Sequence, residues 1–126
     1  MKSTKLLLAG TLTIMLVLAL SACGASSTPM NANISEPKEA TKELTIQASN
    51  WEFDQKEYHV KQGEAVKISV ASSSGFHGVK INDTSYTIKS NESKILSFDK
   101  AGTYEIHCNI ACGSGHTRMK AQIIVE

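Results

Sequence analysis

The chain has no excess of charge of one sign. Its 126 residues include 13 lysines and arginines against 12 aspartates and glutamates, a formal net charge of +1. A nucleic-acid-binding domain typically concentrates lysine and arginine on one face or in one segment. The mixed charges of this sequence show no such concentration, and no polybasic segment that would hold a membrane surface. We therefore expect no nucleic-acid partner.

The sequence also lacks the motifs of common enzyme classes. It contains no recognisable nucleophile–base pair and no glycine-rich phosphate-binding loop. No segment shows the 3.6-residue apolar period of a convincing amphipathic helix. We therefore expect no catalytic site of the chain's own and a fold built mainly from strands.

The chain has one long apolar run, at its N-terminus. Met1 to Lys5 are short and basic, and Leu6 to Leu20 are almost wholly apolar. A membrane-spanning helix needs about 20 apolar residues, so this shorter run favours an export signal over an uncleaved anchor. Leu20 to Cys23 resemble the bacterial lipobox, in which the cysteine becomes the lipid-modified first residue. The expected product is an exported lipoprotein, held by a lipid on Cys23 to the outer face of a bacterial membrane.

Proline is scarce, and both prolines lie in one segment. Pro29 and Pro37 fall within residues 23–43, which are rich in small and polar side chains. Such a segment has too few large apolar groups to form a core. We expect residues 1–22 to be a lipoprotein signal peptide, residues 23–43 a flexible tether and residues 44–126 one small domain.

The remaining sequence has the two-residue period of half-buried strands. Apolar and polar residues alternate over residues 44–49 and 66–70, as in strands with one buried face. Further candidate strands are Tyr58 to Lys61, Gly78 to Ile81, Tyr86 to Lys89, Ser93 to Phe98, Thr103 to His107 and Lys120 to Val125. Turn residues separate them. Seven or eight short strands predict an all-β fold, an antiparallel sandwich with Greek-key connections.

Four potential metal ligands lie in one short segment near the C-terminus. They are Cys108, Cys112, His116 and Met119. Thiolate and thioether sulfur favour Cu(I), and imidazole also suits Cu(II). The segment therefore predicts a redox-active copper site.

The number of cysteines indicates two copper ions. A mononuclear blue-copper site uses one thiolate, two imidazoles and a weak axial thioether, whereas this segment contains two cysteines. Two thiolates can bridge a pair of copper ions and leave one histidine for each. The second histidine must then come from elsewhere, and His77, in the strand-like Ser-Gly-Phe-His-Gly-Val-Lys-Ile segment, is the natural candidate.

The spacing Cys-x3-Cys-x3-His-x2-Met, with an upstream His-Gly-x-x-Ile, resembles the dinuclear CuA domain of cytochrome c oxidase subunit II. Nitrous-oxide reductase carries a similar domain. The resemblance covers roughly residues 44–126 and implies a cupredoxin fold. It implies that the two cysteines bridge both coppers. The implied ligand set is His77, Cys108, Ile110 through its carbonyl oxygen, Cys112, His116 and Met119, with His77 and Met119 on one copper and His116 and Ile110 on the other.

Two features depart from the family. Ile110 stands where the family usually has glutamate, whose side chain can serve a neighbouring metal in the full oxidase. Because the copper ligand at this position is the backbone carbonyl, we expect the copper site to be kept without support for that neighbouring metal. The second departure is that one or two transmembrane helices normally hold the oxidase subunit, whereas here a lipid on Cys23 would be the membrane attachment.

Simpler interpretations compete for the same residues. Cys108 and Cys112 could form a disulfide in an exported protein, which would leave His116 and Met119 without a role. Zinc held by two cysteines and two histidines is chemically possible, but it would leave the thioether idle. Met119 could also be a core residue, the usual role of methionine.

The remaining histidines and the single tryptophan have ordinary interpretations. His59 and His107 are expected to be surface or core side chains, and strand alternation predicts that His107 points away from Cys108. Trp51 is expected to be a packing residue of the core or its rim rather than an electron port.

The resemblance implies a domain that relays single electrons. In a full oxidase the family domain accepts electrons from a c-type cytochrome and hands them to the haem of the catalytic subunit, so a c-type cytochrome or a haem-copper oxidase subunit is the expected partner. The chain would then be an electron-transfer component of an oxidoreductase. The alternatives are a copper storage or delivery lipoprotein for oxidase assembly and a sensor of copper or redox state. Delivery requires an exchangeable site, so a closed set of six ligand atoms favours relay.

Overall fold

The computed structural model describes residues 33–126, so the predicted signal peptide and Cys23 lie outside the described residues. The strands within this range are β1 (Ile34–Ser35), β2 (Lys42–Ser49), β3 (Glu52–Phe53), β4 (Glu57–Val60), β5 (Ala65–Ser72), β6 (Gly78–Ile81), β7 (Thr87–Lys89), β8 (Ser93–Phe98), β9 (Gly102–His107) and β10 (Lys120–Val125). One short 3-10 helix, η1 (His116–Arg118), precedes β10. Over residues 33–126, no helix is long and apolar enough to cross a membrane.

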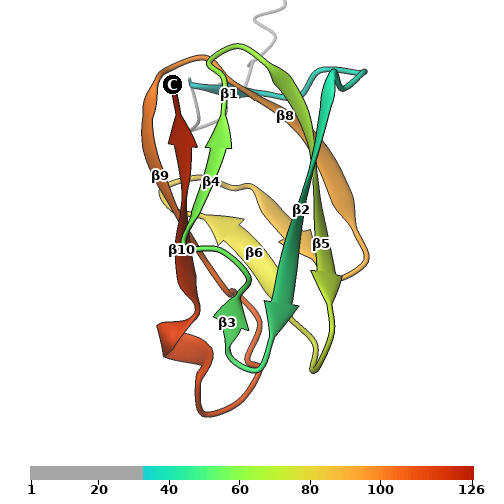
Figure 1. The fold of residues 1–126 in the computed structure, drawn as a ribbon, viewed down its shortest axis with the longest axis vertical. Coiled ribbons are helices and arrows are strands. Elements are labelled where there is room, and N and C mark those ends of the chain that lie inside the picture. Colours follow the sequence, from blue (N-terminus) through green and yellow to red (C-terminus); the bar gives the residue numbers. More distant parts are fainter. Residues whose placement is uncertain (1–32) are drawn as a thin grey trace, which may run out of the picture.

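The strands form two sheets that pack face to face (Figure 1). Sheet A has the order β1-β8-β5-β2-β3, and sheet B has the order β4-β10-β9-β6-β7. The all-β sandwich predicted from the sequence is therefore confirmed. Two neighbouring pairs, β2 with β5 and β4 with β10, run parallel rather than antiparallel. Apolar alternation reports which face of a strand is buried and carries no information about the direction of its neighbour, which is why the sequence did not reveal these two pairs.

Alternation builds the core between the sheets. Ile46 and Ala48 in β2 are buried while Gln47 between them is exposed, and Ile123 in β10 is fully buried. The rings of Phe98 and Tyr104 meet edge to face with centroids 4.9 Å apart, an arrangement that aromatic pairs favour.

Strand pairing begins upstream of the predicted domain boundary at residue 44. Ile34 in β1 pairs with Phe98 in β8 and is 5% exposed, and its carbonyl oxygen accepts a hydrogen bond from the Tyr86 hydroxyl. This strand lies in the segment whose composition predicts a tether. One buried isoleucine anchors it, and a composition averaged over the segment does not reveal a single anchor.

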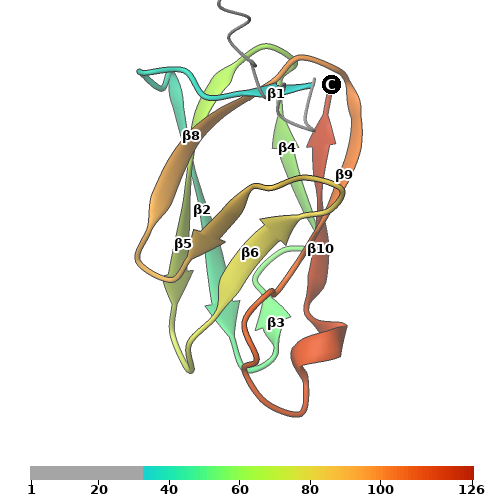
Figure 2. The ribbon, with the colours of Figure 1, turned by 180° about the vertical axis from the view of Figure 1, so that it is seen from behind.

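The register of sheet B brings three strand ends together. Lys80 in β6 and Lys120 in β10 both pair with His107 in β9. The start of β6, the end of β9 and the start of β10 therefore lie side by side. The β5–β6 turn, β3 and η1 gather at this same end of the sandwich, opposite the C-terminus (Figure 2). The candidate ligands lie at this end.

Candidate metal centre

His77, Cys108 and Met119 face the interior because each extends the buried alternation of its strand. His77 stands one residue before β6, Cys108 one residue after β9 and Met119 one residue before β10. Side chains two residues apart point to the same face of a strand, so these three continue the core-facing positions. They are 0%, 2% and 1% exposed, respectively. We call the segment from Cys108 to Met119 the ligand loop. It is closed at its base by a hydrogen bond of 3.1 Å from the Cys108 amide to the Met119 carbonyl oxygen.

The two cysteines form a pair of free thiols. Their sulfur atoms lie 3.7 Å apart, well beyond the disulfide bond length of about 2.05 Å. Thiolate–metal bonds are about 2.3 Å long in protein zinc sites, so both sulfurs can bond the same ion. The donor atoms of His77, Cys108 and Cys112 all lie within 4.8 Å of one another.

Each sulfur has its own imidazole. Nδ1 of His77 lies 3.9 Å from Cys108 Sγ, and Nδ1 of His116 lies 3.6 Å from Cys112 Sγ. A weaker donor also lies beside each sulfur: the Ile110 carbonyl oxygen is 3.3 Å from Cys108 Sγ, and the Met119 thioether is 3.6 Å from Cys112 Sγ. The fold thus brings all the residues of the predicted ligand set to one place.

Hydrogen bonds fix the orientation of the His77 ring. Its Nε2 lies 2.8 Å from the Ser74 carbonyl oxygen and 3.2 Å from Asn50 Oδ1. Both partners are acceptors, so Nε2 carries the proton and Nδ1 presents its lone pair towards Cys108. Ser90 Oγ donates to the His77 carbonyl at 2.7 Å and accepts from its amide at 3.1 Å. The sequence does not reveal these partners, because all three are ordinary polar residues and two of them, Asn50 and Ser90, become neighbours of His77 only on folding.

Trp51 packs against the ligand loop. Its Nε1–H donates to the Cys112 carbonyl oxygen at 2.7 Å. A Cβ at Gly113 would lie 3.0 Å from the ring, and one at Gly115 would lie 2.3 Å from it. Gly113 also has a φ of +116°, a conformation that favours glycine. The loop therefore needs one glycine for backbone conformation and the other for space.

Ile110 lies over the start of β6. A Cβ at Gly78 would come within 2.9 Å of Ile110 Cδ1 and 2.6 Å of Asn109 Oδ1. Gly78 thus leaves room for the isoleucine side chain directly beside His77. Phe76, on the other side of His77, is 57% exposed.

His107 and His59 lie outside the cluster. His107 Nδ1 donates to Asn82 Oδ1, and partial burial lowers the pKa of His107, with a further lowering from the positive charge of Lys80. His59 is exposed and lies 3.3 Å from a Glu126 carboxylate oxygen. Both agree with the ordinary roles predicted for them.

The Cys112 thiol resists ionisation without a cation. Burial raises the pKa of the Cys112 thiol, and the hydrogen bond to Cys108 and its charge raise it further. Two adjacent thiolates repel each other, so a bound metal ion is needed to hold both in the charged form. The donor set therefore fits a soft, positively charged metal.

Known structures share this fold. The chain is similar to the periplasmic domain of subunit II of cytochrome oxidase (CoxB) of Bradyrhizobium japonicum, with a TM-score of 0.65 and 15% identity over 73% of this chain and 88% of that one. It is similar to a chain of a heme-copper terminal oxidase dimer, with a TM-score of 0.58 and 30% identity over 73% of this chain and 71% of that one. Reduced amicyanin gives a TM-score of 0.53 and 21% identity over 75% of this chain and 99% of its own. No protein-family model and no curated protein sequence matches the chain.

The two-sheet fold and the buried cysteine–histidine cluster define a copper electron-transfer domain of the cupredoxin class. The relative at 30% identity, matched over most of both chains, shows to which family within that class the chain belongs. The chain belongs to the family of the CuA domain of cytochrome oxidase subunit II.

Proposed function

We propose that this domain relays single electrons through a dinuclear copper centre. The ligands would be His77, Cys108, Ile110 through its carbonyl oxygen, Cys112, His116 and Met119. The observation that supports the proposal is the paired sulfur atoms, 3.7 Å apart, each with a separate imidazole nitrogen within 3.9 Å. A single blue-type copper needs only one thiolate, so the second cysteine and its own histidine favour two ions. Bound copper would supply one-electron redox chemistry.

The protein's part is to hold the ligands in fixed positions. His77 is held by Ser74 and Asn50, and the loop is held by Trp51. Ligands that a rigid scaffold fixes move little when the copper changes oxidation state. Spreading one charge over two ions reduces the geometric change further, which favours fast electron transfer.

We also propose attachment to a membrane through a lipid on Cys23, after removal of residues 1–22, with the part of the predicted tether 23–43 that precedes β1 as the connection. The signal-like N-terminus supports export, as does the similarity to a periplasmic domain. A haem-copper oxidase subunit or a c-type cytochrome is the proposed redox partner, because the related structures include parts of oxidases.

Burial of the donors argues against copper delivery as the main role. His77, Cys108 and Met119 are each at most 2% exposed, so an acceptor protein would have little access to the ions. We expect the loaded protein to exchange electrons with a c-type cytochrome and to keep its copper beside an apo copper acceptor. Rapid transfer of copper with negligible electron exchange would reverse the choice in favour of delivery.

The decisive experiment is to load the purified protein with copper, count the ions and record the EPR spectrum. We expect two coppers per chain and one unpaired electron shared equally by both. His77→Ala should lose this signal, whereas His59→Ala, which removes a histidine outside the cluster, should retain it. One copper per chain, or a metal-loaded form without an EPR signal under oxidising conditions, would overturn the proposal.

A further inference from the structure

A row of basic side chains crosses the outer face of sheet B beside the candidate centre. Lys80 and Lys120 are the cross-strand partners of His107 on either side. All three alternate out of phase with the buried residues of their strands, so they share the solvent face. Directly opposed side chains on one sheet face have Cβ atoms about 5 Å apart. We call Lys80, His107 and Lys120 the basic row.

The ligand loop adds one more exposed basic residue. Arg118 is exposed and lies in η1 between His116 and Met119. A surface hollow of about 400 Å³ adjoins the row, and its lining includes His107, His116, Thr117 and Lys120. The proposed copper ligand His116 therefore borders a hollow with a basic rim.

Two carboxylates lie near the row. Glu105 also lines the hollow, but it occupies the next position along β9, accepts a hydrogen bond from Asn82 at 2.6 Å and lies 3.8 Å from Lys120. Asp83 follows β6, further along the chain from His77 than Lys80. The chain as a whole is nearly neutral, so this concentration of positive charge is local. The positive charge of the row is that of Lys80 and Lys120, because burial and the charge of Lys80 lower the pKa of His107.

We propose that the basic row, Arg118 and the exposed edge of His116 form the docking surface for a redox protein with an acidic face. A carboxylate of that partner would enter the hollow beside His116, within reach of Lys120. The inference rests on the proposed electron relay and specifies its partner by charge. A c-type cytochrome or an oxidase subunit qualifies only when its contact face is acidic. Charge of this kind acts mainly on the association rate.

The test uses one c-type cytochrome in two forms, with its surface lysines intact and with those lysines succinylated, which turns each positive charge into a negative one. The copper-loaded full-length protein, purified in detergent, is mixed with each form in a stopped-flow instrument. At low ionic strength the succinylated form should react faster, and salt should remove its advantage because surface charges are screened beyond about 10 Å.

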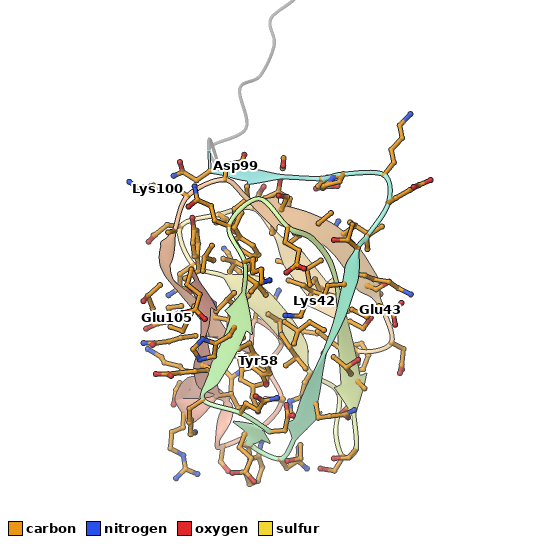
Figure 3. All side chains as sticks on the ribbon, turned by 45° about the horizontal axis from the view of Figure 1, so that its top comes forward. Lys42, Glu43, Tyr58, Asp99, Lys100 and Glu105 are labelled. Atoms are coloured by element: carbon orange, nitrogen blue, oxygen red, sulfur yellow. The ribbon has the colours of Figure 1, made fainter. Side chains whose placement is uncertain are left out.

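Two double variants with the same change in net charge locate the effect. Lys80→Gln with Lys120→Gln should slow the reaction of the succinylated cytochrome about tenfold at low salt. Lys61→Gln with Lys100→Gln removes two exposed charges at the opposite end of the sandwich, where Lys100 lies beside Asp99 (Figure 3), and should leave the rate unchanged. A faster reaction of the native cytochrome, or equal slowing by both double variants, would overturn the docking surface.

Voltammetry of the loaded protein separates this inference from the electron relay itself. A reversible wave without any preference for the succinylated cytochrome would refute the docking surface and leave the relay intact. Absence of a wave would refute the relay. The surface would then be judged by NMR, where the succinylated form must shift the amide signals of Lys80, His107 and residues 116–120 for the surface to stand.

Discussion

At the scale of single residues, the proposed ligands differ in what their loss removes. Bridging thiolates hold both ions, whereas a thioether mainly tunes one. Cys108→Ser or Cys112→Ser should abolish the two-copper centre, while Met119→Leu should keep both ions and shift the reduction potential. Copper content, EPR and voltammetry of the purified variants check these outcomes.

Ile110→Glu is the matched test of the loop, because it restores the side chain usual in the family and leaves the backbone carbonyl in place. We expect both coppers and the spectrum to be retained. Loss of copper with an intact fold would show that the Ile110 carbonyl is not positioned as a ligand.

The acidity of Cys112 gives a second prediction at this scale. Burial and the neighbouring Cys108 raise the pKa of the Cys112 thiol, so the folded, metal-free protein holds it protonated at neutral pH. A raised pKa contributes stability below the unfolded-state value of about 8.5, and this contribution is lost as the pH rises through the folded-state pKa. Alkylation of Cys112 by iodoacetamide should therefore rise with pH at higher values in the folded protein than in urea.

Mass spectrometry of the Cys112 peptide measures that alkylation profile. Cys108→Ser removes one cause of the shift and keeps the burial, so its profile should lie between those of the folded wild type and the unfolded chain. Coincident folded and unfolded profiles would contradict the prediction.

At the scale of the structural elements, the ligand loop depends on its contact with Trp51. A Cβ at Gly115 would lie 2.3 Å from the Trp51 side chain, a distance that forces the loop or the ring to move. Gly115→Ala should lower the free energy of unfolding by about 1–3 kcal/mol and weaken copper retention. Urea denaturation and copper counting measure the two effects.

A double-variant cycle identifies the cause. If the clash with the indole is responsible, Gly115→Ala should cost less in a Trp51→Ala background than in the wild type. Equal costs in both backgrounds would show that the glycine is required for another reason.

Strand β10 offers a test of the alternation that builds the core. Ile123 is fully buried, and its neighbour Ile124 is half-buried on the outer face. Ile123→Ala should lower the free energy of unfolding by about 2–5 kcal/mol, and Ile124→Ala by about 1 kcal/mol or less. Denaturation curves for the two variants compare the same chemical change on opposite faces of one strand. Similar losses would mean that the strand does not present these faces.

The sequence predicts which segments form strands better than it predicts which segments lie side by side. The two-residue alternation predicted β2 and β5, segments bounded by turn residues predicted six further strands, and the spacing of Cys108 and His116 predicted the candidate centre. The two-residue strand β3 is too short to show a period. The contact of His77 with Asn50 joins residues from different loops. No local pattern encodes such contacts, because they depend on how the two sheets pack.

At the scale of the whole molecule, the proposed anchor and the proposed metal centre are independent. Cys23→Ser should release the protein from the membrane fraction or block its processing, and the EPR spectrum of the copper-loaded protein should not change. Cell fractionation and N-terminal sequencing check the first outcome. A variant that stays in the membrane with its first residues intact would favour an uncleaved anchor.

The parallel pairing of β4 with β10 determines when the molecule can finish folding. It sets Tyr58 beside Ile123 and Val60 beside Val125, which are far apart along the chain. Closing so large a loop costs conformational entropy before any contact compensates, and topologies dominated by distant contacts fold in milliseconds to seconds. Until β10 has paired with β4 and β9, the chain lacks the strand that closes the ligand loop. Pairing of β10 must therefore precede the complete assembly of the proposed ligands.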